Sequence, residues 1–366
     1  MGAARDFAST IEHLPPCTCM PRLSSFLASV AIGVLSWLAL APTARALTII
    51  DHFIPAGEEL AGIGLAGEPP QLLAGAGTLK NVFRAAANHW ERVIRDDFTV
   101  EVHFGWFTTA PHSSIAFHQG IASAGTPERQ IEGSIAFSND SLVPFYLDAS
   151  PADNVEFGQQ VAALADLGGG PVNVLREFAP VDAEAAGSVD ILSTAIHELG
   201  HALGLVGWPF FNDEALDGAI NVTIAGFEGT AIPLIGTHLN VAGPATSGFS
   251  RPLGVRRLIT DLDVLAISQV SQFNDFLLPP GSDFNGDWTV DMQDLNNWTA
   301  AMEGSTVADA NHDGLTDGAD FVIWQQQYGW TAGKSSLPVP EPTLLATLCG
   351  LLPYGRFLLR RRRLQR

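Results

Sequence analysis

The stretch Ser193–Leu205, STAIHELGHALGL, constrains the fold of this chain more than any other feature. Its apolar residues recur at helical spacing, so we expect a helix over residues 188–205 with one buried face. His197 and His201 lie four residues apart, which puts both imidazoles on one face of that helix, about 6 Å apart along its axis. Both can reach a single zinc ion with bonds of about 2.1 Å. Glu198 is then placed to act as general base on the water that such a metal activates.

A catalytic zinc normally has three protein ligands, and this helix supplies two of them. Many sites with this extended motif have a third histidine at the position of Gly207, which has no side chain. The remaining downstream histidines are His238 and His312, and His312 lies inside an acidic repeat. We therefore favour His238, which follows a predicted hairpin. A carboxylate ligand, or a two-histidine site that does not function, stays open as an alternative.

The candidate carboxylates have competing explanations. We expect Glu214 in an irregular stretch and Glu228 in a hairpin turn. Asp261 and Asp263 stand at the start of a predicted helix, where Thr260 and acidic groups cap the N-terminus. The full set of carboxylates considered is Asp213, Glu214, Asp217, Glu228, Asp261 and Asp263.

Four segments together resemble the secreted zincin metalloproteases, in particular a bacterial group that carries PEP-CTERM sorting tails. They are Ala86-Ala87-Asn88-His89-Trp90, Thr194–Gly204, Thr237-His238 and Gly254–Asp263. The resemblance covers most of residues 79–270. It implies zinc peptidase activity, with His197, His201 and His238 as zinc ligands and Glu198 as the base.

Two residue types common in such enzymes are missing. The four methionines are Met1, Met20, Met292 and Met302, so residues 47–277 cannot form the methionine turn found beneath the metal in metzincins. After the motif, the tyrosines are Tyr328 and Tyr354, both outside that body. The metal itself is then expected to supply most of the polarisation of the substrate carbonyl.

A composition break divides the chain at Pro279-Pro280-Gly281-Ser282. Before it, a helix is predicted over residues 78–97, strands over 98–104 and 133–140, and a hairpin from INVTIAG and TAIPLIG. We expect residues 47–277 to form an α+β zincin-like metallopeptidase domain, with a mixed sheet and an active-site helix. Residues 283–330 are expected to form a small all-α, dockerin-like domain.

The smaller domain contains a duplicated acidic loop, DFNGDWTVDMQD followed by DANHDGLTDGAD. Oxygen-bearing residues recur at positions 1, 3, 5, 9 and 12, and position 7 offers its backbone carbonyl, as in calcium loops. The loop departs from the EF-hand pattern by Asp at position 12 and by Trp288 at position 6. The repeat resembles a type I dockerin, which implies calcium binding and a cohesin-like partner. The expected ligands are Asp283, Asn285, Asp287, Thr289, Asp291 and Asp294, and Asp309, Asn311, Asp313, Leu315, Asp317 and Asp320.

Both ends of the chain have the composition of targeting segments. Residues 1–46 combine a basic residue, an apolar run and Ala44-Arg45-Ala46, which is typical of a secretory signal peptide. Residues 338–366 contain Pro340-Glu341-Pro342, a short apolar stretch and an arginine cluster. This order resembles the PEP-CTERM tail, which implies an exosortase-like sorting enzyme, a transient membrane anchor and an envelope or extracellular location.

Charge excludes one class of partner. Residues 47–342 contain 37 acidic and 10 basic residues, a net charge of about −27 with neutral histidines. Phosphate binding requires basic surface, so nucleic acid is not expected as a partner. All three cysteines lie in the end segments, so a core and bound metals, rather than disulfides, are expected to stabilise the body.

These features predict an exported zinc endopeptidase that acts on protein or peptide substrates. The alternative is a non-catalytic surface or matrix protein that retains the zincin scaffold and a calcium-dependent interaction module.

Overall fold

The computed structural model describes residues 46–332, apart from residues 109–114, 141–143, 208, 250–251, 303–304 and 306. The expected sorting tail and all but the last residue of the expected signal peptide lie outside the described residues. Within the described part, no helix is both long and apolar enough to cross a membrane. The described residues belong to one compact unit, Arg45–Arg366.

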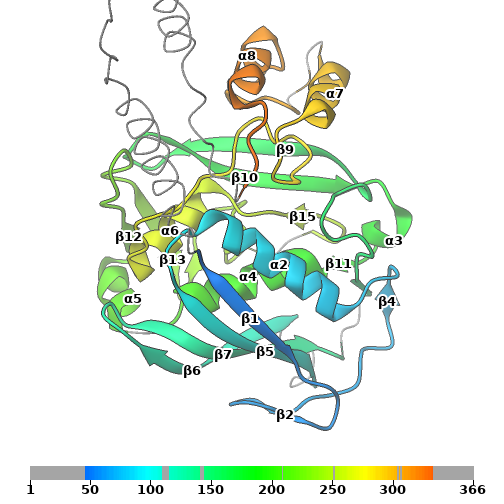
Figure 1. The fold of residues 1–366 in the computed structure, drawn as a ribbon, viewed down its shortest axis with the longest axis vertical. Helices are drawn as coiled ribbons and strands as arrows, with labels where there is room; N and C mark the ends of the chain where they lie inside the picture. The colour runs from blue at the N-terminus through cyan, green and yellow to red at the C-terminus, as the bar shows by residue number, and fades with distance from the viewer. Residues whose placement is uncertain are drawn as a thin grey trace, which may run out of the picture. The chain divides into compact units, whose positions relative to one another are not determined.

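The fold is mixed α/β, with several sheets (Figure 1). The largest sheet has the order β1-β5-β7-β6, in which β1, β5 and β7 are parallel and β6 is an antiparallel edge strand. Alternate residues of β5, among them Val100, Val102 and Phe104, are fully buried, which is the pattern of a strand with one face on the core. The strands are β1 Thr48–Phe53, β5 Thr99–Phe107, β6 Ala116–Ala124 and β7 Arg129–Ser138.

Two helices pack on each other beside this sheet. Thr78 caps α2 (Leu79–Val93) by accepting a hydrogen bond from the Asn81 backbone, and α4 (Ile191–Leu203) carries the HExxH motif. Small residues bring the helices together: a Cβ at Gly200 would lie 3.5 Å from the Trp90 ring. The indole of Trp90 also donates a 3.0 Å hydrogen bond to the Ile196 carbonyl. The alanines and tryptophan of the predicted AAxxW helix therefore hold α4 in place.

A second, three-stranded sheet has the order β15-β10-β9 and is antiparallel. Its strands are β9 Phe157–Asp166, β10 Pro171–Pro180 and β15 Arg256–Arg257. The predicted hairpin is present as β12 (Ala219–Asn221) and β13 (Ala231–Ile235), and β14 (His238–Leu239) pairs with β13. The remaining elements are β2 Glu59–Leu60, β3 Gly64–Leu65, β4 Leu73–Ala74, β8 Phe145–Tyr146, β11 Val189–Asp190, α3 Ala183–Ala186, α5 Pro209–Glu214, η1 Ala215–Asp217 and α6 Asp261–Ser271.

The two acidic loops adopt the same backbone conformation, and each leads into a helix, α7 (Met292–Ala301) or α8 (Gly318–Gln327). Position 6 has a left-handed backbone in both loops, with φ of 69° at Trp288 and 90° at Gly314. Position 9 caps the following helix, and position 12 completes a capping box. The duplicated sequence thus folds as a duplicated structure.

The first acidic loop packs against the larger body. Trp288 is 1% exposed and belongs to the main hydrophobic core. Its indole Nε1 donates a 2.6 Å hydrogen bond to Nδ1 of His89 on α2. Asp283 forms a buried ion pair of 3.1 Å with Arg176 on β10. The parts of the chain before and after the sequence break at Pro279 are therefore in direct contact.

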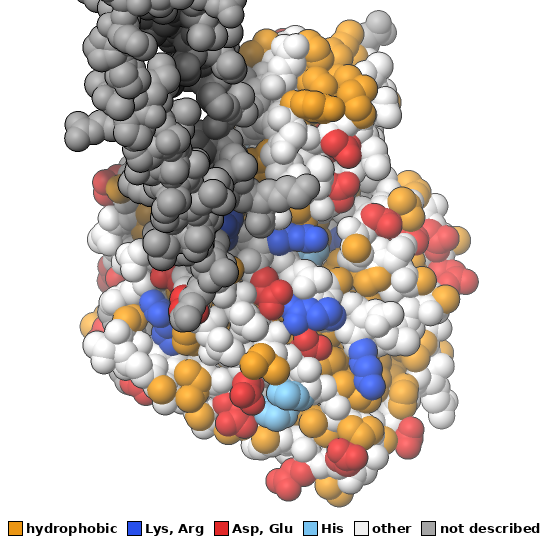
Figure 2. Space-filling view, viewed as in Figure 1, with side chains coloured by type: hydrophobic (Ala, Val, Ile, Leu, Met, Phe, Trp, Pro, Cys, Tyr) orange, Lys and Arg blue, Asp and Glu red, His pale blue; other side chains and the backbone are white. Residues whose placement is uncertain are grey.

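Helices α7 and α8 leave large apolar side chains exposed. Figure 2 shows hydrophobic side chains gathered in the region where Figure 1 places these helices. The exposed residues there include Met292, Met302, Val322 and Tyr328, which are 51%, 46%, 46% and 54% exposed.

Candidate metal centre

The start of α4 is anchored by a buried ion cluster. Arg256 is fully buried and contacts Asp148 at 2.7 Å and Asp190 at 3.0 Å. Asp190 is the N-cap of α4 and accepts hydrogen bonds from the backbone and hydroxyl of Ser193. Burial alone would lower the pKa of Arg256, but Asp190 and Asp148 outweigh it and raise that pKa. Arg256 thus fixes where the motif helix begins.

The end of α4 is set by Gly204. Its φ of 156° is strained for other residues, and a Cβ there would collide with Ser271 on α6. The Gly204 backbone N–H bonds the Gly200 and His201 carbonyls. The helix therefore ends at Leu203, two residues after the second histidine and two before the predicted end at residue 205.

His197, His201 and His238 come together at one point. Their nearest ligand atoms lie within 4.8 Å of one another, and no other group of three or more His, Cys, Asp or Glu in the described residues does so. Nε2 of His201 is 3.2 Å from Nε2 of His238. Two ligands of a tetrahedral zinc with bonds of about 2.1 Å stand about 3.4 Å apart, so this spacing fits. The hairpin β13–β14 brings His238 to the helix.

Backbone carbonyls determine which ring nitrogens carry protons. Nδ1 of His197 lies 2.8 Å from the Ala245 carbonyl, and Nδ1 of His201 lies 2.6 Å from the Leu205 carbonyl. His238 has a hydrogen bond with the Ile235 carbonyl. A carbonyl can only accept, so these bonds hold the proton on Nδ1 of His197 and His201 and direct the Nε2 lone pairs inward.

Burial keeps the rings of His201 and His238 neutral. It lowers the pKa of His201 to about 4, against the opposing effect of the hydrogen bond to Leu205. It also lowers the pKa of His238, where the bond to Ile235 opposes it. The Nε2 atoms of His201 and His238 lie 3.2 Å apart, and a cation between them would take a lone pair from each ring. The donor set therefore fits a zinc ion.

A turn at residues 245–246 supports the motif helix from below. The buried carboxylate of Asp263 accepts hydrogen bonds from the Ala245 and Thr246 backbone and from the Thr246 hydroxyl, at 3.0, 2.9 and 2.6 Å. The Thr246 methyl fills the space beside Gly200, where any Cβ would collide with it. The Ala245 carbonyl in turn orients His197. Held in this way, the turn needs no methionine.

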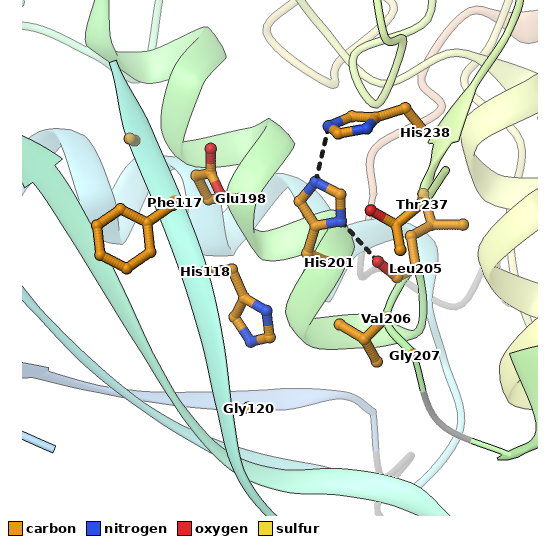
Figure 3. A pocket seen from close by; sticks show the side chains of 11 residues that line it. Phe117, His118, Gly120, Glu198, His201, Leu205, Val206, Gly207, Thr237 and His238 are labelled. Carbon is orange, nitrogen blue, oxygen red and sulfur yellow. Dashed lines mark hydrogen bonds between the residues drawn. The ribbon is translucent and has the colours of Figure 1, made fainter. Parts of the chain in front are cut away.

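A pocket of about 380 Å³ opens beside the triad. Glu198, which is 6% exposed, lines it together with His201, His238 and Thr237 (Figure 3). His118 from β6 also lines it, and its ring is parallel to that of His201 within 17°, with the centroids 6.3 Å apart. The pocket thus brings together a carboxylate, two of the three triad histidines and one further imidazole.

None of the candidate carboxylates joins the triad in the described residues. Glu214 accepts a hydrogen bond from Gln269, Glu228 from the Gly226 backbone, and Asp261 from the Asn173 backbone. The expectation that Glu214 lies in an irregular stretch is wrong, because α5 covers Pro209–Glu214. Proline is favoured in the first turn of a helix, so Pro209 begins this helix rather than preventing it.

The acidic loops share one hydrogen-bond network. In each loop, the carboxylate at position 1 accepts hydrogen bonds from the backbone N–H groups of positions 5 and 6. This carboxylate is Asp283 in the first loop and Asp309 in the second. The carboxylate at position 12, Asp294 or Asp320, accepts hydrogen bonds from the backbone N–H groups of positions 2, 3 and 9. Burial raises the pKa of Asp283 to about 6 and that of Asp294 to about 7. These bonds wrap each loop around its own carboxylates, as a calcium loop requires.

The sequence reasoning missed His118 and the role of Asp263. His118 stands on a strand that was not predicted, and Asp263 was considered as a ligand or a helix cap. No family model, curated protein or solved structure matches this chain.

Proposed function

We propose that this chain is an exported zinc-dependent endopeptidase. The observation that carries the proposal is the convergence of three histidines beside Glu198 in an open pocket, with the inward nitrogens of His201 and His238 3.2 Å apart. His197, His201 and His238 would hold the metal. When bound, zinc lowers the pKa of a coordinated water and polarises a carbonyl oxygen.

Glu198 performs the proton transfers in this proposal. Its carboxylate takes a proton from the attacking water as the water oxygen bonds to the peptide carbonyl carbon. The carbon–nitrogen bond then breaks, and Glu198 delivers the same proton to the leaving amine. The products are a carboxylic acid and an amine, so only water is consumed. The low exposure of Glu198 favours this role, because burial strengthens its interaction with the water.

Zinc content and hydrolysis of an unstructured protein, measured on the purified chain, test this function. We expect about one zinc per chain and cleavage that a chelator abolishes and added zinc restores. The Glu198→Gln variant should keep its zinc and lose at least a hundredfold in kcat. If this variant cuts as fast as the wild type, or if the wild type holds no zinc, the non-catalytic scaffold becomes the better account.

We further propose that the two acidic loops each bind calcium. Asp283, Asn285, Asp287, Thr289, Asp291 and Asp294 would hold one ion, and Asp309, Asn311, Asp313, Leu315, Asp317 and Asp320 the other. The shared hydrogen-bond network and the left-handed residue at position 6 support both sites equally. Calorimetric titration should give two ions per chain and one after Asp313→Ala; two ions bound by the variant would contradict the second site.

The proposed setting is the cell envelope or the medium outside it, reached through the signal peptide and the PEP-CTERM-like tail. A cohesin-like partner for the calcium module and an exosortase-like enzyme for the tail belong to the same proposal.

A further inference from the structure

Among the described residues that line the pocket, His118 offers a hydrogen-bonding side chain besides those of Glu198, His201, His238 and Thr237. Figure 3 shows its imidazole inside the pocket beside His201, below Glu198. It stands on edge strand β6, on the opposite side of the pocket from the Thr237–His238 segment. A peptide bound in the pocket beside Glu198 can therefore come within reach of His118.

Gln130 on β7 determines the orientation of this ring. Its side-chain nitrogen lies 2.9 Å from Nε2 of His118. Gln130 is 3% exposed, so the bond is shielded from solvent. Gly133 makes room for it, because a Cβ there would collide with the Gln130 amide and approach His118 Nε2 to 3.0 Å. The pair is thus held by local packing.

The same bond indicates the tautomer of His118. The Gln130 oxygen is buried and has no hydrogen-bond partner among the described residues. It is the amide nitrogen that faces Nε2 of His118, and an amide nitrogen can only donate a hydrogen bond. The amide nitrogen therefore donates to Nε2, and the His118 proton resides on Nδ1. Burial lowers the pKa of His118 to about 3, which keeps the ring neutral.

We propose that Nδ1–H of His118 donates a hydrogen bond to the scissile carbonyl oxygen of a peptide substrate and stabilises the negative charge that develops there. This inference rests on the proposed peptidase function. His118 would supply the hydrogen-bond donor to the oxyanion, a role for which residues 47–277 have no tyrosine after the motif. Such a donor contributes most when charge forms on the oxygen, so it acts on kcat rather than on KM.

Steady-state kinetics of His118→Ala, His118→Asn and Gln119→Ala on the zinc-loaded full chain test the inference. We expect His118→Ala to lose about a hundredfold in kcat, with KM within about threefold and one zinc retained. The Asn amide nitrogen stands close to the position of Nδ1, so His118→Asn should recover about tenfold of that loss. Gln119→Ala, at the exposed neighbouring position of β6 outside the pocket lining, is the matched control and should remain within about threefold of the wild type.

Binding of a phosphinic peptide, whose tetrahedral oxyanion resembles the charged state, gives a readout that needs no turnover. Its Kd should rise in His118→Ala by about the same factor as kcat falls. If His118→Ala keeps kcat and phosphinate affinity within threefold while the wild type cuts, the inference about His118 fails and the peptidase proposal stands. Loss of zinc in His118→Ala would make it a ligand and would also overturn the inference. If the wild type neither binds zinc nor cuts, the proposed function itself has failed.

Discussion

Trp288 donates its indole N–H to Nδ1 of His89 at 2.6 Å, and this bond joins the first acidic loop to the helix that packs on the metal-centre helix. The neighbouring residue, Trp90, bonds the Ile196 carbonyl directly before His197. The first acidic loop is therefore connected to the histidine triad through helix α2, by one hydrogen bond at His89 and one at Trp90.

The tryptophan at position 6 should stabilise the whole described unit. Trp288→Gly relieves a left-handed backbone, worth about 1 kcal/mol, but removes a buried indole, which costs about 3–5 kcal/mol. We expect the free energy of unfolding, measured in urea with excess calcium, to fall by about 2–4 kcal/mol. Leu315→Ala, at an exposed site in the second loop, should change it by less than about 0.5 kcal/mol. A gain in stability for Trp288→Gly would contradict the prediction.

Acid should weaken the contact between Trp288 and His89. Burial, followed by the charges of Arg92, Arg176 and Arg256, lowers the pKa of His89 well below 6.5. The unfolded chain takes up a proton near pH 6.5 and the folded chain does not. The stability linked to His89 is therefore present above pH 6.5 and is lost as the pH falls below it, by up to about 1.4 kcal/mol per pH unit.

Urea unfolding between pH 7.5 and 5.5 measures this effect against His89→Gln, whose side-chain oxygen still accepts from Trp288. The variant should show a shallower decline on acidification. Burial raises the pKa of Asp261, Asp283 and Asp294, which contributes to the pH dependence with the opposite sign in both proteins and cancels in the comparison. Equal slopes would show that His89 does not titrate as expected.

Asp263 should control metal affinity without touching the metal. Asp263→Ala frees the turn whose Ala245 carbonyl orients His197, so we expect zinc affinity to fall about 10–100-fold. Competition with a chelator of known affinity measures it. Asp261→Asn is the matched control, since Asp261 lies on the same helix but bonds Asn173. The prediction is wrong if both variants bind zinc equally well.

Removal of the buried Arg256 side chain should lower the folding stability more than removal of its neighbour, Arg257. Arg256→Ala leaves Asp148 and Asp190 buried without their partner, which should cost about 3–5 kcal/mol of folding free energy. Arg257→Ala breaks a pair with the partly exposed Glu177 and should cost about 1 kcal/mol or less. Thermal or urea unfolding of the two variants compares them directly. Similar losses in both would mean that burial does not decide the effect.

Local patterns predicted much of the fold. The helices at residues 79–93, 191–203 and 261–271 and the loop–helix repeats follow from apolar spacing, caps and turn residues, which are local properties. His238 followed by elimination, since few residues downstream of His201 can bind a metal. The β9–β10 hairpin was missed, although Gly168-Gly169-Gly170 marks its turn.

What the sequence could not reveal depends on contacts between distant segments. The Asp263 carboxylate meets residues 17 and 18 positions earlier in the chain, and His118 meets His201 only because β6 lies at the edge of the sheet. In the sequence, Trp288 is a departure from the calcium-loop pattern, whereas in the structure its side chain belongs to the core of the larger body. In each case a residue with one local explanation has a second role that only the fold assigns.

The turn held by Asp263 also has a chemical consequence. Every sulfur atom of the chain belongs to Cys17, Cys19, Cys349, Met1, Met20, Met292 or Met302, and none of these lies in residues 47–277. The histidines and the turn beneath them are supported by nitrogen and oxygen atoms alone. Peroxide and similar oxidants attack thiols and thioethers first, so they find no such target in the support of this centre. In the proposed setting outside the cell, the candidate metal centre therefore lacks the side chains that are oxidised most easily.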